Sequence, residues 1–146
     1  SERTYRYDDY SKDNILYPFG FGLTYSDIRV ESAEAEIDDD MIKASVTLSN
    51  SGMSGQDALE VYFRSESPDA VRNYALCAFT KVHLEKGEKK TISMHFPLKN
   101  ITVVGDDGIR YLDKEAKTTL YFGTSLPDSL SCKLTGKTPT AVELHF

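Results

Sequence analysis

The sequence predicts an all-β fold, a β-sandwich of two packed sheets. Apolar and polar side chains alternate with a period of two along several short segments. Turn residues, mainly Gly, Pro, Asn and Asp, separate these segments. No window shows the apolar period of a helix. Many short strands joined by turns are typical of a β-sandwich.

The clearest strands come first. Residues 28–37 alternate with a slip near Ser32, and Asp38 to Asp40 form a charged turn. Residues 41–50 then alternate without interruption, with Ile, Ala, Val and Leu on one face. Asn50 and Gly52 follow as a turn, for which we expect positive φ angles.

The middle of the chain contributes two further strands around a polar loop. We expect a strand at residues 59–64, a loop at 65–73 and a strand at 76–84. Phe79, together with its neighbours Val82 and Leu84, is expected in the core, where one such side chain contributes about 1.5–3 kcal/mol. Gly87 is expected in a turn with positive φ.

The remaining strands are shorter. They are expected at residues 91–96, 101–104, 109–112, 118–122 and 141–146, and the turn at Gly105 to Gly108 predicts a hairpin.

Composition excludes several classes of function. The 146 residues suit one domain, with 40% hydrophobic and 27% charged side chains. A net charge of -6 and the absence of a basic face argue against nucleic-acid binding. No apolar run approaches the ~18 residues of a membrane span. The N-terminus shows no hydrophobic signal core, and the compartment stays unassigned.

The first 25 residues predict an extended arm rather than part of the sandwich, which would occupy residues 26–146. Tyr5, Tyr7, Tyr17 and Tyr25 crowd this non-periodic segment. Aromatic side chains at this density suit a surface that another body covers. Packing of the arm against its own domain is the alternative, and both arrangements are compatible.

Four segments in order resemble one known domain. The first is the motif Tyr17-Pro18-Phe19-Gly20-Phe21-Gly22-Leu23-Thr24-Tyr25, and residues 46–62, 76–88 and 121–128 follow. They resemble the C-terminal fibronectin type III-like domain of glycoside hydrolase family 3 enzymes, of the β-glucosidase and β-xylosidase kind. Phe21 stands where that family commonly has tyrosine.

The resemblance implies an immunoglobulin- or fibronectin type III-like β-sandwich with an extended N-terminal arm. It also implies that the chain is not an enzyme by itself, because the family's catalytic carboxylates lie in other domains. The expected partners are the catalytic domains of the parent enzyme and a neighbouring subunit. The docking residues would be those of the arm: Tyr5, Tyr7, Tyr17, Pro18, Phe19, Phe21, Leu23 and Tyr25.

The chain offers little chemistry of its own. Its acidic residues are expected in solvated turns and on polar strand faces, and no metal or cofactor is expected. His83 and His95 fall on the polar phase of their strands, without an indicated third ligand. Cys77 and Cys132 are expected as free, mostly buried thiols rather than a disulfide.

Two other functions remain open. One is a carbohydrate-binding module, with Tyr62, Tyr74, Tyr111 and Tyr121 as candidates for the sugar platform. The other is a loop at the parent's substrate entrance, with Arg64, Arg72 and Tyr74 as the candidate residues.

Overall fold

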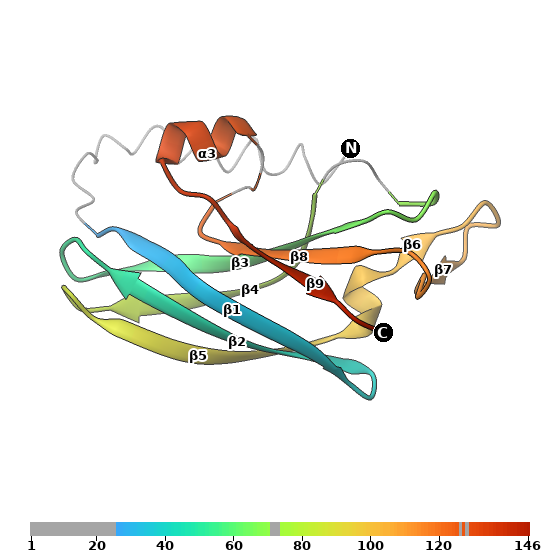
Figure 1. Cartoon of the computed structure of the whole chain (residues 1–146), viewed down its shortest axis with the longest axis horizontal. Helices are drawn as coiled ribbons and strands as arrows, with labels where there is room; N and C mark the ends of the chain where they lie inside the picture. The colour runs from blue at the N-terminus through green and yellow to red at the C-terminus, as the bar shows by residue number, and fades with distance from the viewer. Residues whose placement is uncertain (1–25, 71–73, 126, 128) are drawn as a thin grey trace.

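The computed structural model describes residues 26–70, 74–125, 127 and 129–146, and two antiparallel sheets pack face to face in it (Figure 1). One sheet has the order β1-β2-β5, formed by Ile28–Asp38, Met41–Asn50 and Lys89–Pro97. The other has the order β4-β3-β8-β9, formed by Ala75–Leu84, Gly55–Ser65, Thr118–Gly123 and Thr140–Leu144. This architecture confirms the predicted all-β sandwich.

Smaller elements join the strands. A 3-10 helix η1 (Leu98–Ile101) leads into the hairpin of β6 (Val103–Val104) and β7 (Arg110–Tyr111), which projects from one end of the sandwich (Figure 1). The hairpin was predicted, but its first strand begins at Val103 rather than at the expected Ile101, because Ile101 ends η1. Helix α3 (Ser129–Thr135) was missed, since seven residues are too few to show a helical period.

The core lies between the two sheets and follows the predicted alternation. From the three-stranded sheet, Ile42, Val46 and Leu48 are fully buried, and they meet side chains from β3 and β8. The fully buried members on that side are Leu59, Val61, Leu120 and Phe122. Removal of this apolar surface from water is the main stabilising contribution to the fold.

The slip predicted near Ser32 is a β-bulge. The pairing of β1 with β2 shifts between Val30 and Ser32, so one extra residue enters β1. The bulge lets Ile28 and Val30 on one side, and Ala33 and Ala35 on the other, contact the same core.

The expectation that Phe79 is a core residue was wrong. Its side chain is 64% exposed, whereas Cys77 and Val82 on the same strand are buried. The register of β4 against β3 shifts after Val61, where Cys77 is the extra residue. Because side chains alternate, one added residue reverses which face they occupy, and Phe79 lies opposite Glu60 on the outer face.

The expected positive φ angles at Asn50 and Gly52 were also wrong. Within the described residues, positive φ occurs at Asp39, Gly87, Gly108 and Gly136, which confirms the expectation for Gly87. The side chain of Asn50 is buried and makes hydrogen bonds to the backbone of four residues, Asp27, Gly52, Met53 and Leu84. Its amide therefore holds the turn through side-chain bonds rather than through an unusual backbone angle.

Candidate functional site

The outer face of the four-stranded sheet carries a cluster of three tyrosines. Tyr62 of β3 lies opposite Tyr121 of β8, while the neighbouring pair Phe63 and Leu120 faces the core. The ring of Tyr74, which precedes β4, lies 4.9 Å from the ring of Tyr121 at an interplanar angle of 86°. We call Tyr62, Tyr74 and Tyr121 the tyrosine cluster.

An arginine extends this cluster. The guanidinium carbon of Arg64 lies 5.5 Å from the centre of the Tyr74 ring, which is a cation–π contact. The side chain of Arg64 is exposed, and Tyr74 is half-buried. The structure thus brings together Arg64 and Tyr74, two of the three residues predicted for a substrate-entrance loop.

Beside this cluster lies Glu60, whose carboxyl group has a raised pKa. The Tyr62 hydroxyl donates a hydrogen bond to its Oε1 over 3.2 Å. Burial, and then the nearby charge of Asp57, raise the pKa of Glu60 from 4.5 to about 7. Sequence reasoning missed Glu60 because it treated the acidic residues as solvated.

Glu60 and Asp57 do not form the carboxyl pair of a glycosidase. Asp57 lies opposite the buried Val82, whereas Glu60 lies opposite the exposed Phe79. The two carboxyl groups therefore belong to opposite faces of β3. A glycosidase acid and its partner carboxylate face the same sugar from either side of one bond.

The end of the sandwich that bears the β6–β7 hairpin contains a pocket of about 200 Å³. Arg64 and Arg110 line it together with Asp69, Asn100 and Val104. Arg110 Nη1 lies 3.5 Å from the Thr102 hydroxyl, and in the described part of the chain neither guanidinium has a carboxylate oxygen within 4.0 Å. The sequence analysis did not name Arg110 as a site residue, although Arg110 lies in the hairpin that the turn at Gly105 to Gly108 predicted.

Tyr111 fastens the hairpin to the loop after β3. Its hydroxyl donates a hydrogen bond to the Asp69 carboxylate, and this bond raises the pKa of Tyr111. Tyr111 thus lies on the hairpin, and among the described residues no ring contact joins it to the tyrosine cluster.

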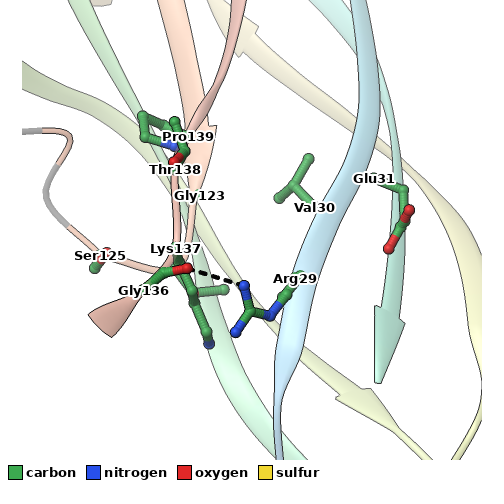
Figure 2. A pocket seen from close by; sticks show the side chains of 10 residues that line it. Arg29, Val30, Glu31, Gly123, Ser125, Gly136, Lys137, Thr138 and Pro139 are labelled. Carbon is green, nitrogen blue, oxygen red and sulfur yellow. Dashed lines mark hydrogen bonds between the residues drawn. The ribbon is translucent and has the colours of Figure 1, made fainter. Parts of the chain in front are cut away.

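The opposite end of the sandwich has a pocket of about 250 Å³ (Figure 2). Its two cationic side chains, Arg29 and Lys137, already have partners within the chain. Arg29 contacts the Asp27 carboxylate at 3.0 Å. Its guanidinium also donates to the Gly136 carbonyl at 3.0 Å, as the dashed line in Figure 2 marks. Lys137 Nζ donates to the Ile28 carbonyl at 2.8 Å and lies 3.9 Å from Asp27. These contacts join β1 to the segment before β9, which is a structural role.

The histidines and cysteines do not come together. His83 of β4 pairs with Glu85, which directly follows that strand, and His95 lies on β5 of the other sheet. Among residues that the structure describes, no three His, Cys, Asp or Glu side chains are grouped to hold a metal. Cys77 and Cys132 are both free, Cys77 buried and Cys132 half-buried, and burial raises the pKa of Cys77 to about 12.

Several predicted site residues fall outside the described residues. They are Arg72 and the eight arm residues Tyr5, Tyr7, Tyr17, Pro18, Phe19, Phe21, Leu23 and Tyr25. Over the described parts of the chain, no helix has the length and apolar character needed to cross a membrane.

Comparison with known proteins points to enzymes that act on glycosides. No family model matches the chain. It is 33% identical over 140 residues to a β-glucosidase of Kluyveromyces marxianus, covering 88% of this chain and 16% of that protein. It is 28% identical to a xylan 1,4-β-xylosidase of Xylanibacter ruminicola, covering 91% of this chain and 15% of that protein.

Solved structures agree. The crystal structure of the Kluyveromyces marxianus β-glucosidase in complex with glucose superposes with a TM-score of 0.63 at 28% identity. The match covers 97% of this chain and 17% of the β-glucosidase. The chain therefore spans a small part of the length of the relatives it matches.

Proposed function

This chain belongs to the fibronectin type III-like domains of family 3 glycoside hydrolases, and from this premise we propose that it docks on the catalytic domains of a larger enzyme and stabilises them. The observation that supports the proposal is the small fraction of each relative's length that this chain matches. The fraction is 16% of the β-glucosidase and 15% of the β-xylosidase. In this proposal the parent enzyme is a β-glucosidase or a β-xylosidase.

A non-catalytic role agrees with the chemistry of the described residues. Glu60 and Asp57 belong to opposite faces of β3, so they do not flank one sugar. The cations of the pocket in Figure 2 are held by Asp27 and by backbone carbonyls. Neither arrangement offers an acid and a nucleophile to one substrate.

The proposal assigns the sandwich to residues 26–146 and a docking arm to residues 1–25. The support for the arm is its sequence, in which tyrosines gather around the Tyr17-Pro18-Phe19-Gly20 motif. Catalytic domains of the same chain, and a neighbouring subunit, are the proposed partners.

Deletion of residues 1–146 from the complete enzyme tests this function. We expect the truncated enzyme to unfold at a lower temperature and to lose turnover faster on heating, because the contact surface of the catalytic domains becomes exposed to water. Unchanged stability, assembly and turnover would show that the module does not dock.

A second candidate is supported by the contact of Arg64 with Tyr74. An exposed arginine held on an aromatic ring suits a loop that contacts substrate hydroxyl groups. In the complete enzyme, R64A and Y74A would then raise KM for long oligosaccharides but not for a short aryl glycoside. Equal kinetics on both substrates would exclude this role.

The geometry is less favourable for an independent carbohydrate-binding module. Tyr62 is only 2% exposed, and Tyr74 and Tyr121 meet edge to face rather than in one plane. A sugar ring stacks on an exposed, flat aromatic surface. Titration of the chain with xylan and cello-oligosaccharides would detect binding if this reading holds.

A further inference from the structure

We propose that the catalytic domains are contacted through the hairpin end, the surface formed by Arg64, Asp69 and the β6–β7 hairpin, and that Arg64 and Arg110 bind carboxylates of those domains. This inference rests on the proposed docking function and adds the surface and its chemistry.

The pairing of the arginines is the first observation. The structure describes three, at positions 29, 64 and 110, and they are all exposed. Arg29 has the Asp27 carboxylate at 3.0 Å, whereas Arg64 and Arg110 have none within 4.0 Å among the described residues. A planar guanidinium suits paired hydrogen bonds to a carboxylate.

The lack of a carboxylate partner at Arg64 and Arg110, within the part of the chain that the structure describes, is notable because the chain is acidic overall. The chain has 23 acidic and 17 basic residues, so carboxylates are plentiful. Arg64 and Arg110 nevertheless line one pocket, and Asp69, the only acidic residue among its described lining residues, accepts the Tyr111 hydrogen bond. The pocket therefore presents positive charge on a chain of net charge -6.

Exposed apolar side chains next to this pocket are the second observation. On the hairpin, Val104 is 43% exposed, Ile109 is 63% exposed and Tyr111 is 38% exposed. Arginine and tyrosine beside apolar side chains are characteristic of the energetically important part of a protein–protein interface.

The hairpin is also held in a defined shape, which is the third observation. Gly105 N donates to the Ile109 carbonyl at 3.0 Å, and Ile109 N donates to Asp107 Oδ1 at 3.0 Å. The bond from Tyr111 to Asp69 fixes the hairpin against the loop after β3. A surface that is ordered before binding loses less conformational entropy when it binds.

The remaining part of the parent enzyme is the occupant that these observations favour. The related β-glucosidase is matched over 16% of its length, so in such an enzyme most of the protein lies outside the module. An apolar protein surface with acidic residues at its rim complements both Ile109 and the two arginines. A polysaccharide would use the arginines but not the aliphatic side chains.

Hydrogen exchange of residues 103–111 tests the proposal. We expect the amides of the hairpin to exchange at least about tenfold more slowly in the complete enzyme than in the isolated 146-residue chain. The double variant R64Q/R110Q, and separately I109S, should remove most of this protection in the complete enzyme. Arg29→Gln is the matched control and should leave it intact.

The isolated chain provides the folding control. R64Q/R110Q should unfold there at the same temperature as the unmodified chain, because both side chains are exposed. Equal hairpin exchange in the complete enzyme and the isolated chain would overturn the proposal, even without any variant. Hairpin protection that is retained in R64Q/R110Q, as it should be in R29Q, would also overturn the proposal.

Two further outcomes separate the alternatives. Hairpin protection that appears in the isolated chain with an acidic xylan, and is absent from the complete enzyme, would identify a polysaccharide as occupant and overturn the proposal. A truncated enzyme as stable as the complete one would refute docking itself. Loss of stability on truncation without hairpin protection would refute only this surface.

Discussion

The side-chain amide of Asn50 donates a hydrogen bond to the Leu84 carbonyl over 3.1 Å and joins the ends of the two sheets. Asn50 ends β2 of the three-stranded sheet, and Leu84 ends β4 of the other. The same amide donates to the Met53 carbonyl at 2.8 Å, while its oxygen accepts from the Asp27 and Gly52 amides at 2.9 Å. One side chain thus fixes three segments of the chain.

Asn50→Ala should lower the free energy of unfolding by about 2–4 kcal/mol, because it leaves one buried and three partly buried backbone groups without partners. Urea denaturation followed by circular dichroism measures the change. Asn100→Ala is the control, since Asn100 makes one described hydrogen bond, to the Cys77 carbonyl, and should cost about 1 kcal/mol. Equal losses in the two variants would contradict the joining role of Asn50.

Glu60→Gln should stabilise the protein in a pH-dependent way. The pKa of Glu60 is about 7 in the folded protein against an ordinary value of 4.5, so the folded state holds the proton more tightly. The free energy of unfolding of the unmodified protein therefore falls as the pH rises from about 4.5 to about 7. With screening by solvent, the variant should gain about 1–2 kcal/mol at about pH 8 and nothing at about pH 4.

Thermal unfolding at the two pH values measures this difference. The control is Glu143→Gln on the same outer face, where the exposed carboxylate lies 3.8 Å from Lys117. Its removal should change the stability by less than about 1 kcal/mol. A Glu60 variant with equal effects at both pH values would contradict the raised pKa.

Phe79→Ala should cost less than about 0.5 kcal/mol, because the ring is 64% exposed. Phe122→Ala should cost about 3–5 kcal/mol, because that ring is fully buried between the sheets. The two variants remove the same atoms, so their denaturation midpoints compare the two environments directly. A large loss at Phe79 would show that the register shift at Cys77 is misplaced.

Cysteine labelling should distinguish the two thiols. Burial raises the pKa of Cys77 to about 12, so its reactive thiolate is scarce at neutral pH, while Cys132 is only half-buried. An aromatic disulfide reagent should modify one thiol in the folded chain and both after denaturation. C132S should abolish the fast reaction, and C77S should leave it unchanged.

Regular alternation is what made the sandwich predictable from sequence. In β2 every second side chain is apolar, and Val46 and Leu48 face the core as expected. The slip near Ser32 was also visible, because the apolar residues fall on even positions before it and on odd positions after it. The position of the bulge at Cys77 was not visible, because Cys77 and Phe79 share one apolar phase and the change to the phase of Val82 appears in the sequence only after Phe79.

The candidate site was predictable only in part. Arg64 and Tyr74 were chosen at the two ends of one predicted loop, and the structure brings their side chains into contact. Arg110 comes from a distant segment and reaches the same pocket through the η1 turn and the hairpin. Such a juxtaposition depends on how the end of the sandwich is closed, which local patterns do not specify.

The extra residue in β4 has a consequence for self-association. β4 is the edge of its sheet, where a flat, regular strand would offer its backbone to a second chain and start aggregation. At Cys77 the regular spacing of backbone groups is interrupted, and the Asn100 amide already occupies the Cys77 carbonyl. The irregularity that turned Phe79 outward thereby also protects the exposed border of the sheet against strand-by-strand growth.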